Sequence, residues 1–118
     1  MRDSIVVGLM LGDEGKGTIV DYLATENTPA SVVRFSGGSQ AAHNVVAENG
    51  WHHTFTQFGA ASLRCVPTTL SRYMMVNPFA LVQEGDALYE LTGWNPFPSL
   101  KVSGEALVTT PVHIWLNQ

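Results

Sequence analysis

The segment 12–18, with the sequence GDEGKGT, combines three glycines with two carboxylates and one ammonium group. It follows a short apolar run at residues 4–9 and precedes apolar residues spaced as in a helix at 19–23. A strand, a glycine-rich turn and a helix start in that order form a phosphate site, because the free N–H groups of the helix start and the positive end of its dipole attract anions. Lys16 adds a positive charge to this predicted site.

The segment departs from the standard phosphate-binding loop, G-x-x-x-x-G-K-[ST]. Met10 stands where that pattern has its first glycine, and Gly17 stands where it has a hydroxyl residue after the lysine. Gly12, Gly15 and Gly17 still allow the backbone to close around a phosphate group. We therefore predict that a variant loop binds phosphate here.

Asp13 and Glu14 stand where their charges would repel a bound phosphate. This cost is understandable if a divalent cation bridges carboxylate and phosphate, or if one carboxylate acts as a general base. The alternative is a pair of solvated acids in the first helical turn, where negative charge interacts favourably with the helix dipole.

Two separate blocks resemble the adenylosuccinate synthetases. Residues 5–23 are similar to the N-terminus of that family, and residues 32–44, with the sequence VVRFSGGSQAAHN, are similar to a strand that leads into its Gly-Gly-His-Asn-Ala-Gly-His-Thr loop. Residues 75–78, MVNP, resemble the family's strand that ends before a long helix. The register holds across most of the 118 residues.

The resemblance implies a ligase that joins inosine monophosphate (IMP) and L-aspartate at the expense of GTP. Asp13 matches the aspartate that takes the proton from N1 of IMP, after which O6 attacks the γ-phosphate of GTP. Aspartate then displaces phosphate from the 6-phosphoryl intermediate. His43 matches the general acid that stabilises charge at O6 and at the phosphoryl group. The alternative for His43 is a strand histidine packed under a hairpin.

The resemblance also implies a set of phosphate- and metal-binding residues. Mg2+ is expected at Asp13 and at the carbonyl of Ala42, which replaces a family glycine. The residues expected to bind the nucleotide and its phosphates are Gly12, Glu14, Gly15, Lys16, Gly17, Gly37, Gly38, Ser39 and Gln40.

Several positions depart from the family pattern. Met10 and Leu11 replace Gln-Trp, and the pair 39–40 replaces His-Asn. Asn44 replaces a threonine. These changes leave the purine and the phosphate donor open, including a related synthetase that acts on another purine nucleotide. Retention of Asp13 favours a 6-oxopurine of the IMP type.

The apolar pattern predicts the elements that position these residues. We expect a buried strand at 4–9, a helix at 15–25 and a second strand at 30–35, joined as a right-handed parallel unit. Both glycine segments then reach the same edge of an open parallel sheet and face one pocket. The predicted fold class is α/β, an open and mostly parallel sheet with flanking helices, similar to the P-loop NTPases and incomplete.

Further elements follow from turn and capping residues. Asn49-Gly50 predicts a hairpin between 45–47 and 51–55, because both central residues tolerate positive φ. A strand at 72–77 leads into a helix that Asn77 caps and that runs to residue 91. Short strands are expected at 100–102 and 106–110, followed by a helix that begins at residue 111.

Composition excludes some classes of protein. The net charge is −4 with six Lys and Arg residues, which argues against nucleic acid as a partner. No apolar run reaches membrane-spanning length and the N-terminus lacks a signal-peptide pattern, so we expect neither membrane insertion nor export. The single Cys65 suits a reducing cytoplasm, and we expect it to be a partly buried small apolar residue.

Synthetases of this family are much longer than 118 residues, so the resemblance implies that residues 1–118 form the N-terminal, nucleotide- and IMP-binding part of one domain. The full-length form is expected to be a homodimer, and this part alone is expected to be inactive. Two alternatives are a nucleotide-binding module without phosphoryl transfer and a non-functional truncated fragment. The exposed apolar helix start at 111–116 is consistent with truncation.

Overall fold

The computed structural model of the chain describes residues 3–27, 29–38 and 40–117. Its elements, in chain order, are α1 (Lys16–Asn27), β1 (Val32–Gly37), β2 (His43–Val46), β3 (His52–Phe55), the 3-10 helix η1 (Ala60–Arg64), β4 (Thr68–Val76), α2 (Pro78–Thr92), the 3-10 helix η2 (Phe97–Ser99), β5 (Lys101–Val102), β6 (Leu107–Val108) and α3 (Pro111–Leu116).

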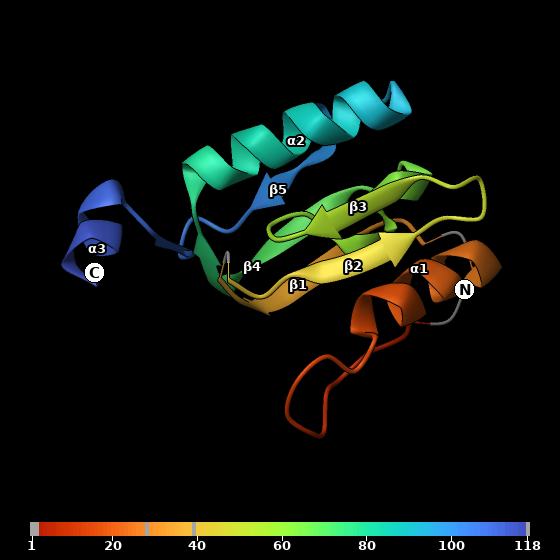
Figure 1. The fold of residues 1–118 in the computed structure, drawn as a ribbon, viewed down its shortest axis with the longest axis horizontal. Helices are drawn as coiled ribbons and strands as arrows, with labels where there is room; N and C mark the ends of the chain where they lie inside the picture. Colours follow the sequence, from red (N-terminus) through yellow and green to blue (C-terminus); the bar gives the residue numbers. More distant parts are fainter. Residues whose placement is uncertain (1–2, 28, 39, 118) are drawn as a thin grey trace.

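Strand β4 is the centre of a parallel sheet. It pairs in parallel with β1, β5 and β6, while β2 and β3 form a separate antiparallel hairpin. In Figure 1 the hairpin lies over the parallel strands, with α1 along one side and α2 along the other. The predicted α/β class with a mostly parallel sheet and flanking helices is confirmed.

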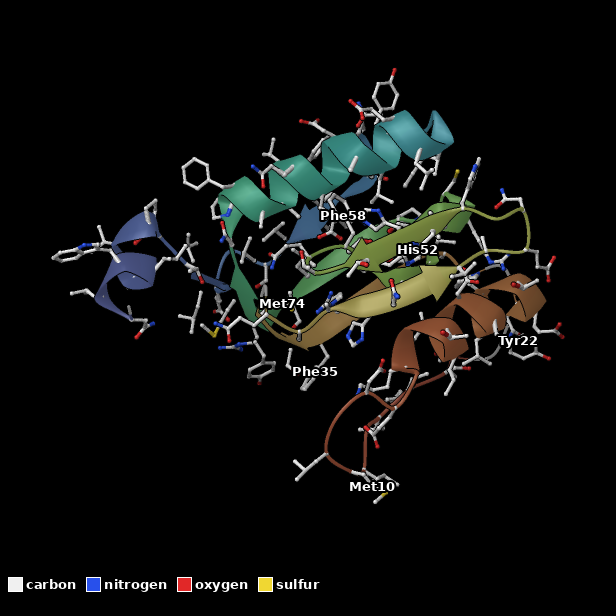
Figure 2. All side chains as sticks on the ribbon, viewed as in Figure 1. Met10, Tyr22, Phe35, His52, Phe58 and Met74 are labelled. Atoms are coloured by element: carbon white, nitrogen blue, oxygen red, sulfur yellow. The ribbon has the colours of Figure 1, made fainter. Side chains whose placement is uncertain are left out.

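The main hydrophobic core lies between the hairpin and α2. Val45 of β2, Phe55 of β3 and Leu88 of α2 are almost completely buried, together with Phe58 in the segment that follows β3. Figure 2 shows Phe58 beside α2. Burial of these four apolar side chains stabilises the hairpin against the helix by about 1.5–3 kcal/mol for each side chain.

The parallel sheet has one covered and one exposed face. Side chains alternate along its strands, so Arg34 and Met74 point inward while Phe35 and Tyr73 are exposed. The rings of Phe35 and Tyr73 contact each other with centroids 5.2 Å apart. Figure 2 shows Phe35 on the outside of the sheet. Parallel sheets usually have both faces covered, and the described residues cover only one.

The predicted strand at 4–9 is wrong. The segment has no paired neighbour among the described residues, and Ile5 and Leu9 are 89% and 92% exposed. A parallel strand needs a hydrogen-bonded neighbour and cover on both faces, and the described part of the chain provides neither here. The expected strand–helix–strand unit is therefore absent from the described residues, and α1 follows an extended segment instead (Figure 1).

The hairpin turn differs in detail from the predicted turn. The pairing of β2 with β3 is confirmed, with Val46 opposite His52. Gly50 has φ +86° and its N–H donates to the carbonyl of Ala47 at 2.9 Å, while Asn49 Oδ1 accepts from Trp51 N–H at 3.0 Å. The prediction placed Asn49 and Gly50 together at the centre of the turn, both with positive φ. In the structure only Gly50 of this pair has positive φ, and it is the last residue of the turn.

Helix α2 begins and ends as its sequence predicts. Asn77 Oδ1 accepts hydrogen bonds from the N–H groups of Phe79 and Ala80 at 3.1 and 3.2 Å. Gly93 ends the helix with φ +74° and donates to Tyr89 O at 2.8 Å.

The prediction that Cys65 is partly buried is wrong. Cys65 is exposed and ends η1 with φ +59°. The buried residues of η1 precede it, and the chain reaches the surface at Cys65.

Glu84 of α2 fixes the segment that follows β3. Its carboxylate is 7% exposed. It accepts hydrogen bonds from the N–H groups of Thr56 at 3.0 Å, Gln57 at 2.8 Å and Phe58 at 3.0 Å. A short polar stretch can therefore cross the core without leaving backbone donors unpaired.

In the C-terminal part, the predicted strands are shorter than expected, and the predicted helix forms as α3 with all of its described residues exposed. Figure 1 shows α3 standing apart from the other helices. Of the helices that the structure describes, none combines the length and apolar character that crossing a membrane requires.

Candidate functional site

The glycine-rich segment forms an open loop that leads into α1. Gly12 and Gly15 have φ values of +91° and +69°, a conformation that favours glycine. Asp13 is exposed, and its Oδ1 accepts a hydrogen bond from Gly15 N–H at 2.9 Å. Figure 2 shows Met10 at the tip of the loop, away from the body of the protein.

Glu14 turns back onto the loop. Its Oε1 accepts hydrogen bonds from the N–H groups of Leu9 and Met10 at 3.0 and 2.8 Å, and its Oε2 lies 3.2 Å from Nζ of Lys16. The donors of Met10 and Leu9, followed by Lys16, hold the pKa of Glu14 below its ordinary value. The two neighbouring acids therefore differ: Asp13 is exposed to solvent, whereas Glu14 is bonded within the loop.

The two sequence motifs meet at one cavity of about 260 Å³ between the N-terminal segment and β1. Lys16 and Gly17 of the first motif line it, and so do Ser36 and His43 of the second. The two motifs therefore border one cavity through these four residues, whereas Asp13 and the other described glycine-loop residues predicted for the site are not in its lining.

His43 is packed directly against the start of α1. A methyl group added at Gly17 would lie 2.8 Å from Cβ of His43, so glycine is needed for this close approach. Partial burial lowers the pKa of His43, and the charges of Arg34 and Lys16 lower it further, while Asp13 acts in the opposite direction. The imidazole is therefore neutral at pH 7.

His43 is expected to titrate at a lower pH in the folded chain than in the unfolded chain. Because its folded pKa is depressed, the unfolded state binds the proton more readily, and His43 contributes stability that is lost as the pH falls below about 6.5. NMR titration of the imidazole in native and in urea-unfolded protein measures both values. A native value equal to or above the unfolded one contradicts the electrostatics of this cavity.

Two further residues of the cavity lining are absent from the predicted site. Arg34 is 8% exposed and donates from Nη1 to Phe58 O at 3.3 Å, and Gly8 lies beside the side chains of Glu14 and Lys16. The sequence contains a signal for Arg34, because a charged residue interrupts an otherwise apolar strand. Gly8 was not predicted because it lies within the apolar run 4–9, which was interpreted as a strand.

Other predicted site residues lie elsewhere. Gly37 has φ +109°, which explains the glycine at the end of β1. Gln40 and Ala42 are exposed and, within the described ranges, are not part of the cavity lining. Ser39 lies outside the described residues. Among the residues that the structure describes, no group of three or more His, Cys, Asp or Glu side chains forms a metal cluster.

A helix that starts at a glycine-rich loop beside a parallel sheet is typical of α/β proteins that bind phosphate groups. Comparison with known proteins identifies one family within that class. The adenylosuccinate synthetase family model matches residues 5–118. The chain therefore belongs to the adenylosuccinate synthetase family.

Curated relatives align with nearly all of the chain. The adenylosuccinate synthetase of Thermoplasma acidophilum is 38% identical over 112 residues, which are 95% of this chain and 24% of that protein. The Staphylococcus aureus strain N315 synthetase is 34% identical over 125 aligned residues, 97% of this chain and 26% of that protein. The chain thus spans about a quarter of the length of these curated relatives.

Two solved structures share the fold. Fully ligated adenylosuccinate synthetase from Plasmodium falciparum has a TM-score of 0.77 and 24% identity, covering 90% of this chain and 24% of its own. The succinoaminodeoxyadenylate synthetase of cyanophage S-2L, bound to dGMP and dATP, has a TM-score of 0.65 and 20% identity, covering 84% and 27%. At 24% and 20% identity, the similarity to these two structures shows a shared fold and nothing further.

Proposed function

We propose that this chain supplies the phosphate loop and the acid–base residues of a GTP-dependent ligase that joins IMP and L-aspartate. The observation that carries the proposal is the packing of His43 against Gly17, which brings an imidazole and Lys16 to one cavity at the start of α1. Family membership supports it.

Asp13 is the proposed general base. A lactam oxygen is a poor nucleophile until the ring nitrogen loses its proton, so transfer of the N1 proton of IMP to Asp13 activates O6. The hydrogen bond from Gly15 N–H to Oδ1 orients the carboxylate while leaving it exposed to a substrate. O6 then forms a bond to the γ-phosphorus as the bond to GDP breaks, and the amino group of aspartate later displaces phosphate.

His43 and Lys16 are proposed to stabilise the charge that develops on the transferring phosphoryl group. A neutral imidazole can donate one hydrogen bond to an oxygen at O6 or at the phosphoryl group, and the ammonium of Lys16 neutralises negative charge. The lowered pKa of His43 keeps the ring neutral before the substrates bind.

Asp13 and the carbonyl of Ala42 are the oxygen donors proposed to hold Mg2+, and neither lines the cavity beside His43. Asp13 has a carboxylate oxygen beyond the one that accepts from Gly15, and Ala42 is exposed with its carbonyl in the second loop. Both are hard oxygen donors of the kind that Mg2+ prefers, and phosphates and water supply its remaining ligands. When bound, the ion neutralises phosphate charge near two acidic residues.

The proposal extends to the complete protein. Recognition of guanine and of L-aspartate is proposed to belong to a part of the protein outside these residues, because the chain spans only 24% of the Thermoplasma acidophilum relative. A homodimer and a cytoplasmic location are part of the same proposal. A free, exposed Cys65 suits a reducing compartment.

A chimera tests this function. Residues 1–118 replace the matching quarter of the Thermoplasma acidophilum synthetase, and adenylosuccinate formation and phosphate release are measured with GTP, IMP and L-aspartate. We expect turnover, and we expect Lys16→Met to lower kcat/KM by about ten- to a hundredfold because one charge-assisted contact is lost. Lys101→Met, at an exposed position of β5, is the matched control.

A folded chimera that binds GTP and IMP but releases no phosphate contradicts the ligase. That outcome favours the second candidate, a nucleotide-binding module. The changed loop residues at 39–44 motivate this alternative, because they alter the family's contacts beside the base.

A further inference from the structure

The phosphate loop already holds an anion, which is its own Glu14. Three groups suited to a phosphate oxygen are the N–H groups of Leu9 and Met10 and the ammonium of Lys16. All three bind the Glu14 carboxylate, the N–H groups through Oε1 and the ammonium through Oε2.

The local shape of the loop accommodates this carboxylate. A methyl group added at Gly8 would collide with the carboxylate of Glu14 and lie 3.0 Å from Nζ of Lys16, so the absence of a side chain there makes room. Successive backbone N–H groups form a concavity that binds anions, and two of them converge on Oε1. Glu14 thus makes the contacts that an external anion would make.

We propose that Glu14 is an intramolecular plug of the phosphate loop, which holds Lys16 and the N–H groups of Leu9 and Met10 until a phosphate group displaces it. The inference rests on the proposed function, because it assumes that this loop binds phosphate. The plug explains why an acidic residue lies in a phosphate site. The Glu14 carboxylate binds the loop when no phosphate is present, and a more highly charged anion displaces it.

Displacement is structurally simple. The loop is exposed around Glu14, and Gly12 and Gly15 flank it in conformations that glycine adopts without strain. Released Glu14 can move into solvent or approach a cation that accompanies the phosphate. The competition weakens apparent affinity, because a ligand binds only the fraction of molecules in which the loop is open.

The test compares four versions of the 118-residue chain: wild type, Glu14→Gln, Lys16→Met and Glu26→Gln. Glu26 is an exposed acid near the C-terminal end of α1 and serves as the control for a change of charge. The probe is inorganic tripolyphosphate, which carries no base and no metal, and calorimetry measures its affinity. We expect Glu14→Gln to bind about tenfold more tightly than wild type, because the competing carboxylate charge is gone. We expect Glu26→Gln to match wild type and Lys16→Met to bind more weakly.

NMR gives a second readout. The amide signals of Leu9 and Met10 are expected to shift in Glu14→Gln, and in wild type they are expected to shift when tripolyphosphate is added. Wild type that binds the probe while Glu14→Gln binds equally or more weakly overturns the plug and leaves the phosphate site standing. Failure of both chains to bind overturns the plug and the phosphate site together. A tenfold gain in tripolyphosphate affinity for Glu14→Gln, together with a folded chimera that binds GTP and IMP but releases no phosphate, refutes the ligase alone.

Discussion

Asp13→Asn in the chimera is expected to lower kcat by about a thousandfold, within the range for loss of a general base. Asparagine retains an oxygen that can accept the hydrogen bond from Gly15 N–H, so the loop conformation is preserved. An amide cannot take the N1 proton of IMP, and without that transfer O6 remains a poor nucleophile. The measurement is steady-state turnover together with calorimetric binding of GTP and IMP, which we expect to change much less than kcat.

The matched control for this substitution is Asp86→Asn, at an exposed position of α2. It removes the same charge from a surface remote from the loop in sequence and is expected to leave kcat unchanged. Turnover of Asp13→Asn within tenfold of the parent chimera would refute Asp13 as the base. A loss of nucleotide binding equal to the loss of turnover would point instead to a role of Asp13 in holding the phosphates or Mg2+.

Glu84→Ala is expected to lower the free energy of unfolding of the 118-residue chain strongly at 25 °C. The substitution removes the acceptor for three backbone N–H groups at 56–58 and for the Thr56 hydroxyl, which lies 2.5 Å from Oε2. Buried donors without a partner make the expected loss on the order of 3–5 kcal/mol. Small domains have only about 5–15 kcal/mol of stability, so this loss is large. Urea denaturation followed by circular dichroism measures it.

Two variants control for this loss of stability. Glu84→Gln keeps one carbonyl oxygen as an acceptor and is expected to lose less stability than Glu84→Ala. Glu90→Ala, at an exposed position of the same helix, is expected to change the free energy of unfolding by less than about 0.5 kcal/mol. If Glu84→Ala and Glu90→Ala have the same midpoint, the carboxylate does not stabilise the core segment.

The same carboxylate gives stability a defined dependence on pH. Burial raises the pKa of Glu84, but His53 and the donors of Thr56, Gln57 and Phe58 together hold it below its ordinary value. The Nε2 atom of His53 lies 3.9 Å from Oε1, too far for a hydrogen bond, so His53 acts through its charge when protonated. A depressed folded pKa means that the stabilisation is complete above the unfolded value and is lost as the pH falls through the folded one.

Features that depend on nearby residues could be predicted from the sequence. Asn77 caps α2, Gly50 closes the hairpin and α1 starts at Lys16, because caps and turns are decided by contacts within a few residues. The meeting of Lys16 and Gly17 with Ser36 and His43 was also predicted, but from a parallel strand–helix–strand unit that does not form among the described residues. The extended segment before α1 lines the cavity with β1 instead.

The tertiary structure decided the rest. Whether the apolar run 4–9 is a strand depends on a neighbour with which it can pair, and the described part of the chain offers none. Whether an acid in a glycine loop faces solvent or the loop depends on the backbone donors near it. Glu14 accepts from the N–H groups of Leu9 and Met10, whereas Asp13 accepts only from that of Gly15 and is exposed. Side chains alternate between the two faces of β1, and Arg34 lies on the covered face, where it lines the cavity. Which face is covered is decided only when η1 and the hairpin pack on the strand. Local chemistry thus determined the loops and caps of this protein, whereas pairing and burial, which join residues distant in sequence, determined the surroundings of its site.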